Sequence, residues 1–319
     1  MIVKIFVVGA TGYVGSAVAR AFKARGHAVA GLARNENAAA SLDQAGVAPL
    51  TGAISDPDFC DRISDHDVVV MAAMIPFEEE APFMTRLLET FKGQDKHVVF
   101  TSGTGVLSID AKDGAWNQAT FAEDDPFPFP VRYNREIRIQ TEDLVRNASD
   151  GHLRTYVIRP PLIFGHAGSI QIPQIFESAR KTGQACYLGE GLNLYSAVHV
   201  DDLAEAYCLA VERGTPGALY HTVAGEANFR SIAEAVAAVV GCETRSLTYE
   251  EACELWGAFW VDIALAVNSR SIARRTVEEL GWRPKYRDVI EDIRSGSYRD
   301  HYEARKIDGP QEFSWKSHG

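Results

Sequence analysis

Short apolar runs alternate with amphipathic stretches along the first half of the chain. The apolar runs have the length and the β-branched content of buried strands, and they are Ile2–Val8, His27–Leu32, Val68–Ala73, Val98–Thr101 and Thr155–Arg159. The stretches between them have helical spacing, and they are Gly15–Arg25, Ala38–Ala45, Phe83–Phe91 and Asn134–Asn147. This alternation predicts an α/β fold, with a doubly wound parallel sheet covered by helices on both faces.

The pattern changes in the second half of the chain. Residues 165–196 are rich in glycine, and the region after Asn228 is mostly helical, with expected helices at Ile232–Val240, Tyr249–Trp256 and Ser271–Leu280. We expect these segments to form a smaller C-terminal substrate-binding lobe over the carboxyl edge of the sheet. The predicted division is 1–165 plus 197–224 for the sheet domain, and 166–196 plus 225–319 for the lobe and the tail.

Two polar segments are expected to lie in solvent. The run Glu78-Glu79-Glu80 is predicted to be a solvated loop, because short charge runs usually face water. The tail after Tyr298 carries five charged residues between Glu303 and Glu312, and we expect it to be loosely held.

Charge and composition narrow the class of partner. The 319 residues are 46% hydrophobic and 24% charged, which is typical of a globular protein. Because 32 Lys and Arg stand against 43 Asp and Glu, the net charge is −11. Nucleic acids and anionic membranes both attract clustered positive charge, so neither is an expected partner. No apolar run approaches the ~20 residues of a membrane-spanning helix.

The N-terminus and the cysteines indicate a compartment. The first predicted strand runs directly into a glycine loop, without the charged region and cleavage site of a secretory signal. The five cysteines are odd in number and none forms a Cys-x-x-Cys pair, so neither a disulfide scaffold nor structural zinc is expected. These features predict a protein of the reducing cytoplasm, and they are compatible with a homodimer.

A glycine-rich loop follows the first predicted strand. It reads Gly9-Ala10-Thr11-Gly12-Tyr13-Val14-Gly15 and opens the first predicted helix. At this spacing the first glycine permits a tight turn, the second lets the backbone approach a pyrophosphate, and the third lets helix and strand pack closely. The helix N-terminus adds unpaired N–H groups and a partial positive charge. Within a βαβ pattern, the loop predicts a Rossmann-type dinucleotide site.

The end of the second predicted strand discriminates between cofactors. An acidic residue there binds the ribose 2′-OH of NAD, whereas an arginine suits the 2′-phosphate of NADP. The strand ends in Leu32-Ala33-Arg34-Asn35, and the first carboxylate comes only at Glu36. Arg34 is always charged and can bind a phosphate through two N–H groups, so it predicts NADP(H) rather than NAD(H). The alternative is a solvated surface arginine.

Five short motifs within residues 1–295 carry a resemblance to a known enzyme family. They are Gly9-x-x-Gly12-x-x-Gly15, Ala72-Ala73, Thr101-Ser102-Gly103, Arg159-Pro160-Pro161 and Val198-His199-Val200-Asp201-Asp202. Together they resemble the extended short-chain dehydrogenase/reductases of the NAD(P)-dependent epimerase/dehydratase superfamily. The resemblance implies a small-molecule substrate and a cofactor site whose adenosine and ribose are lined by Ile54, Ala72, Ala73 and Met74. It also implies that Thr101, Pro160 and Ile163 contact the cofactor, the last two near its nicotinamide.

The catalytic residues of that family are not all matched here. Such enzymes resemble one another in a Ser or Thr near the fifth strand and a Tyr-x-x-x-Lys on the next helix, where the lysine lowers the pKa of the tyrosine. If Tyr133 is that tyrosine, Ile137 takes the lysine position. If Glu142 to Val145 is aligned with the family's Glu-x-Leu-Val instead, Asn134 and Arg138 take the two positions.

Four catalytic candidates follow from these alignments. The family serine falls on Gly103, so its neighbours Ser102 and Thr104 are candidate hydroxyl donors beside Tyr133. Arg138 cannot transfer a proton at neutral pH, but it can bind the ribose or stabilise an oxyanion. The chain is interpreted as an atypical member that keeps the dinucleotide site and lacks the standard triad.

Two further positions restrict the substrate. Nucleotide-sugar members usually carry Asn at the position of Leu162, and an Arg for the diphosphate at the position of Tyr195. Their replacement favours a smaller, partly apolar substrate. Trp116, Trp256 and Trp260 are candidates to cover it, with core packing as the alternative for Trp256 and Trp260. We therefore expect an NADPH-dependent oxidoreductase that reduces a carbonyl-type group. The alternatives are a non-catalytic NADP(H)-binding sensor and a sugar epimerase or dehydratase.

Two histidines lie near acidic residues. His199, Asp201 and Asp202 are residue types that form metal sites and catalytic clusters. However, the resemblance implies that this stretch is a structural junction between the lobes. We therefore expect no metal ligand there. His166 is a candidate to face the substrate, with a solvated loop histidine as the alternative.

Overall fold

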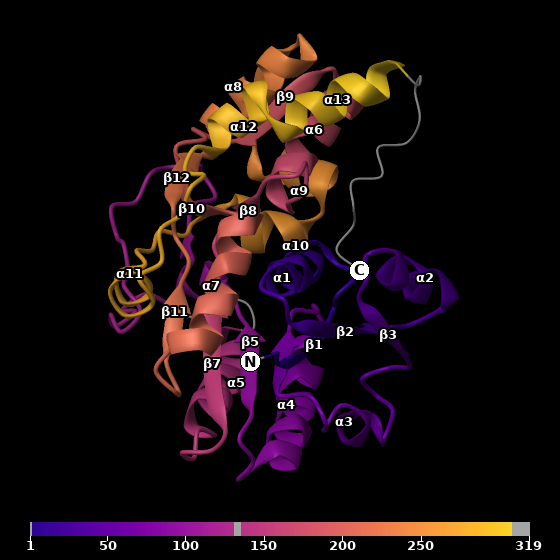
Figure 1. The fold of residues 1–319 in the computed structure, drawn as a ribbon. Helices are drawn as coiled ribbons and strands as arrows, with labels where there is room; N and C mark the ends of the chain where they lie inside the picture. Colours follow the sequence, from indigo (N-terminus) through magenta and orange to yellow (C-terminus); the bar gives the residue numbers. More distant parts are fainter. Residues whose placement is uncertain (1, 131–134, 308–319) are drawn as a thin grey trace.

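A parallel sheet of seven strands, covered by helices, lies at the centre of the larger part of the molecule (Figure 1). The structure is a computed structural model that describes residues 2–130 and 135–307. Its strands lie in the order β11-β7-β5-β4-β1-β2-β3 and are all parallel. Their bounds are β1 Lys4–Val8, β2 Ala28–Ala33, β3 Ala48–Thr51, β4 Val68–Met71, β5 His97–Thr101, β7 Arg154–Arg159 and β11 Leu219–His221. The predicted α/β fold with a doubly wound parallel sheet is confirmed.

Helices cover both faces of this sheet. One face packs against α1 (Tyr13–Ala24), α2 (Glu36–Gln44) and α7 (Val200–Arg213), and the other against α3 (Phe59–Arg62), α4 (Phe77–Phe91) and α5 (Arg135–Asn147). Alternate residues of β1 separate the two cores: Ile5 and Val7 face α1, whereas Phe6 and Val8 face α4. Both cores form because every residue of Ile5–Val8 is apolar, which places a buried strand at the centre of the sheet.

A smaller lobe packs at the carboxyl edge of the sheet, in the upper part of Figure 1. Its strands are β8 (Leu162–Phe164), β10 (Leu194–His199) and β12 (Gly225–Asn228) in one sheet, and β9 (Gln184–Leu188) with β13 (Glu243–Leu247) in another. Its helices are α6 (Gln171–Thr182), α8 (Phe229–Val240), α9 (Tyr249–Trp256), α10 (Ala258–Trp260), α12 (Val289–Ser295) and α13 (Ser297–Ile307).

Short elements connect the lobe to the sheet. They are η1 (Thr104–Leu107), β6 (Ile109–Asp110) paired with β14 (Val267–Asn268), the π-helical turn η2 (Val261–Leu265) and α11 (Arg274–Leu280). The helix α11 begins later than the expected start at Ser271, because Ser271 and Ser196 exchange hydrogen bonds instead. Among the described helices, none has the length and apolar character needed to cross a bilayer.

Two expectations about polar segments are wrong. The run Glu78-Glu79-Glu80 forms the first turn of α4 rather than a loop, and Glu80 is only 1% exposed. Acidic residues stabilise a helix N-terminus through the helix dipole, and Glu80 also has a half-buried cationic partner in Arg138. Residues 299–307 were expected to be loosely held, but they belong to the helix α13. This helix is anchored by Tyr298, which is fully buried and stacks on Phe176.

Candidate active site

The glycine loop lies between β1 and α1 and is closely packed. Gly9 has φ +90°, and a Cβ there would lie 2.7 Å from the backbone nitrogen of Ala73. A Cβ at Gly15 would lie 2.0 Å from the carbonyl oxygen of Gly9. Two of the three glycines are therefore required by the protein's own backbone, for the turn and for close packing of helix and strand.

The third glycine and its neighbours shape the start of α1. Gly12 has φ −81° and ψ 174°, which any residue can adopt, so its own conformation does not require a glycine. No side chain caps the helix at Gly12 and no acidic residue lies in its first turn, which leaves N–H groups available for an anion. Thr11 is exposed, Val14 is half-buried, and the Tyr13 hydroxyl donates to the carbonyl oxygen of Gly165 at 2.7 Å.

The other expected cofactor residues lie at neighbouring strand ends. Arg34 directly follows β2, is exposed, and has no ion-pair partner among the described residues. Ala72 and Ala73 follow β4 and are half-buried, and Met74 beside them is 59% exposed. Ile54 is half-buried, and its carbonyl oxygen accepts a hydrogen bond from Arg86 at 2.8 Å. Because carboxyl ends of parallel strands share one edge, these positions border the glycine loop.

A cavity of about 250 Å³ lies farther along this edge, beyond the ends of β5 and β7. Expected residues in its wall are Ser102, Arg138, Pro160, Ile163, Tyr195 and Trp260. The other residues of the wall are Phe77, Gly103, Gly105, Val106, Ser108, Arg135, Pro161, Ser169, Ile170, Gln171, Phe259, Asp262, Ile263 and Ala264. The wall is mostly apolar and contains a few polar groups, which is the usual composition of a small-molecule site.

Ser102 and Arg138 are in direct contact in the cavity wall. Nε of Arg138 donates to the Ser102 hydroxyl oxygen at 3.3 Å, and Nη2 donates to the carbonyl oxygen of Thr101 at 3.1 Å. Nη1 of Arg138 forms an ion pair with Glu80 of α4. Burial raises the pKa of Glu80, and the charge of Arg138 opposes that shift. The guanidinium lies at the end of β5, and its carbon is 5.2 Å from the ring centre of Phe77 and 5.3 Å from that of Phe100.

A buried ion pair between Glu142 and Arg159 also holds Ser102 in place. The Ser102 hydroxyl donates to Glu142, and Arg159 binds both carboxylate oxygens of Glu142, with Nε to Oε1 at 2.8 Å. Arg159 also approaches Nε2 of His221 at 3.5 Å. Burial, and then the charge of Arg159, lowers the pKa of His221 to about 3, so this ring is neutral at pH 7. The serine oxygen is therefore fixed between one cation and one carboxylate.

The structure separates the other catalytic candidates. Thr104 is fully buried and is absent from the described cavity wall, and its hydroxyl accepts from Ser269 at 3.3 Å. The Thr101 hydroxyl lies 2.6 Å from the hydroxyl of Tyr207, so its side chain faces α7. Tyr133 lies outside the described residues, and its role stays a prediction.

The aromatic wall of the cavity depends on a helix break. Gly257 has φ +83° and separates α9 from α10, so Trp256 and Trp260 do not share one continuous helix face. Trp256 packs in the core of the lobe, and its Nε1 donates to Gln174 at 3.0 Å, whereas Trp260 and Phe259 line the cavity. Sequence reasoning missed Phe259 as a residue of the site. The signal that could have found it is Gly257, which ends α9 shortly before the aromatic pair Phe259 and Trp260.

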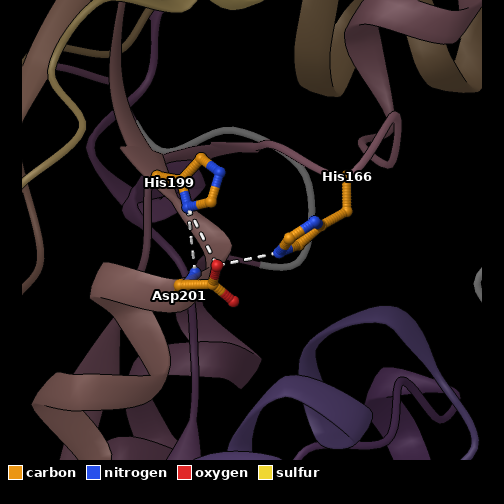
Figure 2. Close-up of side chains that lie close together, drawn as sticks. All are labelled: His166, His199 and Asp201. Atoms are coloured by element: carbon orange, nitrogen blue, oxygen red, sulfur yellow. Dashed lines mark hydrogen bonds and ion pairs between the residues drawn. The ribbon is translucent and has the colours of Figure 1, made fainter. Parts of the chain in front are cut away.

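His166, His199 and Asp201 meet beside the glycine loop (Figure 2). Their nearest ligand atoms lie within 4.8 Å of one another. Each has a partner within the cluster: Nε2 of His166 lies 2.8 Å from Oδ2 of Asp201, and Nδ1 of His199 accepts from the Asp201 backbone at 3.2 Å. Arg20 also lies 3.8 Å from Asp201. These contacts join the loop after β8, where His166 has φ +50°, to the start of α7.

Comparison with known proteins identifies the relatives of this chain. Residues 5–223 match the model of the NAD dependent epimerase/dehydratase family. An uncharacterized protein of Schizosaccharomyces pombe is 30% identical over 306 residues, which cover 92% of this chain and 99% of that protein. These matches confirm the resemblance that the sequence motifs predicted.

Two relatives with described reactions are reductases of ketones. One is the 4-hydroxy-2-methyl-3-oxo-4-farnesyl-3,4-dihydroquinoline-1-oxide ketoreductase of Stigmatella aurantiaca, which is 28% identical and is matched over 70% of this chain and 68% of its own length. The other is the 2-alkyl-3-oxoalkanoate reductase of Stenotrophomonas maltophilia. It is 28% identical, and the match covers 72% of this chain and 71% of that protein.

A solved structure has the same architecture. The dTDP-glucose 4,6-dehydratase of Bacillus anthracis, solved in complex with NAD, superposes with a TM-score of 0.76 over 96% of this chain and 98% of that one. Its sequence is 17% identical, so this likeness concerns the fold alone.

Proposed function

Because the chain belongs to the NAD dependent epimerase/dehydratase family, we propose that it is an NADPH-dependent reductase of a ketone or aldehyde on a small, partly apolar molecule. One observation carries the proposal: Ser102 and Arg138 lie together in the wall of an apolar cavity, at the same sheet edge as the glycine loop. The two ketone reductases among its relatives support the same reaction class.

The residues at the sheet edge fit a nicotinamide dinucleotide. The uncapped N-terminus of α1 and the glycine loop suit a pyrophosphate. The exposed guanidinium of Arg34 suits a 2′-phosphate, which favours NADP(H). Ala72, Ala73 and Met74 would border the adenosine and its ribose, whereas Pro160 and Ile163 would border the nicotinamide. When bound, the nicotinamide supplies the hydride that reduces the carbonyl carbon.

Ser102 is proposed to hold the carbonyl oxygen of the substrate. Its hydrogen would turn from Glu142 toward that oxygen, and Glu142 would keep both of its bonds from Arg159. Arg138 would remain beside the serine oxygen and stabilise the negative charge that develops during reduction. Arg138 cannot give up a proton at pH 7, so Tyr133 is proposed to protonate the alkoxide.

Consumption of NADPH in the presence of a panel of ketones and aldehydes tests this function. The wild type should oxidise NADPH with at least one apolar carbonyl compound, and Ser102→Ala should lower kcat by ~10²-fold, the usual scale for a lost oxyanion contact. Ser108→Ala is the matched control, because Ser108 lines the same cavity and has no described contact with Arg138. Full turnover by Ser102→Ala would refute the role given to Ser102.

A second candidate function is a sensor of NADP(H) without chemistry. The specific observation in its favour is that the polar groups of Ser102 and Arg138 are already bonded to Glu142 and Glu80. A sensor would bind NADPH tightly and reduce no carbonyl compound. The same assay distinguishes the candidates when binding is measured beside turnover.

A further inference from the structure

One arginine of the cavity wall differs from its neighbours in having no carboxylate partner. Arg138 is paired with Glu80, and Arg159 just behind the wall is paired with Glu142. No described carboxylate lies within ion-pair distance of Arg135, although it lines the same cavity. In and just behind this part of the wall, three guanidinium groups therefore stand against the two carboxylates of Glu80 and Glu142.

The known contacts of Arg135 leave one edge of its guanidinium unused. Its Nε donates to the carbonyl oxygen of Val106 at 2.5 Å, and the ring of Phe127 covers one face at 4.5 Å. No described protein atom accepts from Nη1 or Nη2. These contacts fix the plane of the group, so the two terminal nitrogens form a preorganised pair of parallel donors.

The surroundings of Arg135 favour an anion. Burial, and then the positive charge of Arg159, lowers the pKa of Arg135, which means that its charge is poorly compensated. Glu142 and Glu136 act in the opposite direction but more weakly. Arg135 is also the first described residue of α5, and the helix dipole is positive toward the N-terminus of a helix. An anion in the cavity would therefore relieve an excess of positive charge.

We propose that Arg135 binds a carboxylate of the substrate, so that the substrate is an apolar ketone or aldehyde that also carries a carboxylate. This inference rests on the proposed reductase function. Two parallel N–H donors match the two oxygens of a carboxylate. The carbonyl would lie toward Ser102, and the carboxylate toward Arg135, both of which line the one cavity.

Apolar residues of α10 and η2 explain the apolar body of the substrate. Phe259, Trp260 and Ile263 come from these two elements and line the same cavity. Asp262 also borders the cavity there, but its Oδ1 accepts a hydrogen bond from the Tyr249 hydroxyl at 2.8 Å. A substrate carboxylate would be repelled by Asp262 and attracted by Arg135, which orients the molecule in one direction.

Matched pairs of ligands test this orientation. Each pair shares one oxo skeleton, as the free carboxylate and as its methyl ester, and is given to wild type, Arg135→Met and Arg135→Lys. The wild type should prefer the carboxylate by ~10-fold or more in kcat/KM, the scale of a charge-assisted pair. Arg135→Met should lose the preference through KM, with the ester unaffected, and Arg135→Lys should keep part of it. A wild-type preference retained in Arg135→Met would refute the role of Arg135.

Calorimetric titration of the same pairs into the NADPH-loaded protein separates two kinds of failure. Tighter binding of the carboxylate than of the ester, lost in Arg135→Met, supports the subsite even if neither ligand is reduced, and then only the reductase proposal fails. Equal binding of both ligands to the wild type overturns the subsite, whatever the turnover. A phosphonate of the same skeleton is a third arm, and binding of the phosphonate in preference to the carboxylate would also overturn the proposal.

Discussion

Nε of Arg138 lies 3.3 Å from the hydroxyl oxygen of Ser102 in the wall of the apolar cavity. The same hydroxyl donates to Glu142, so the serine oxygen is held by one hydrogen bond that it accepts and one that it donates. A guanidinium stays protonated at any physiological pH, so Arg138 can act on the reaction only through its charge and its hydrogen bonds. The charge of Arg138 and the transfer of a proton to the substrate are therefore two separate contributions, and each can be tested with its own variant.

Arg34 should select the cofactor. Arg34→Ala should weaken NADPH binding roughly tenfold or more, because a hydrogen bond between charged groups contributes on the order of 1.5–3 kcal/mol. NADH binding should change little. Fluorescence titration of both cofactors measures this, with Arg230→Ala, an exposed arginine of the smaller lobe, as the control. Tighter binding of NADH than NADPH by the wild type would contradict the assignment.

Gly12 and Gly15 should respond differently to substitution. Gly12→Val should nearly abolish NADPH binding while the melting temperature stays close to that of the wild type, because φ −81° suits valine but the side chain would occupy the space of the pyrophosphate. Gly15→Ala should lower stability by about 1–3 kcal/mol, because its Cβ would meet the Gly9 carbonyl. Cofactor affinity and thermal melting are measured for both. Wild-type affinity in Gly12→Val would mean that the ligand binds elsewhere.

The strands and the glycine loop could be predicted because their signals are local. Residues 5–8 and 68–71 are apolar without interruption, and the spacing of Gly9, Gly12 and Gly15 is readable directly from the sequence. The structure explains the glycines at positions 9 and 15, because a side chain at either position would collide with neighbouring backbone atoms.

The polar part of the site could not be predicted, because each partner comes from a distant segment. Glu80 belongs to a run of three glutamates, and the charges alone gave no sign that the third would be buried against Arg138, which is 58 residues away. Arg135 showed no periodic or motif signal. Its role depends on which arginines nearby are already paired, and that is decided only by tertiary contacts.

The pair of Glu80 and Arg138 should give a pH-dependent stability. A carboxyl group whose pKa is raised on folding favours the folded state at low pH, and this contribution is lost as pH rises from about 4.5 through the folded pKa. Arg138→Ala removes the charge that opposes this shift. The loss of unfolding free energy caused by Arg138→Ala should therefore grow from pH 5 to pH 8, toward about 3 kcal/mol. Urea unfolding across this range measures it. In a Glu80→Gln background the effect of Arg138→Ala should not vary with pH, and equal variation there would contradict the assignment.

Tyr133 should be the proton donor if the reductase proposal holds. Tyr133→Phe should lower kcat by ~10²-fold or more on a substrate of the wild type, which is the usual scale of lost acid–base catalysis. NADPH affinity should be unchanged, since the phenol is not assigned to cofactor binding. Steady-state kinetics and a cofactor titration measure both quantities. Full turnover by Tyr133→Phe would assign the proton to Ser102 or to water.

The most direct test of the account follows the hydride itself. The protein is incubated with NADPH carrying deuterium at both C4 positions of the nicotinamide and with oxo compounds from the panel, and the products are analysed by mass spectrometry and NMR. The account predicts one deuterium on the carbinol carbon of the product, delivered to one face, at a rate that falls by ~10²-fold in Ser102→Ala. Tight NADPH binding without deuterium in any product would contradict the reductase and leave the sensor.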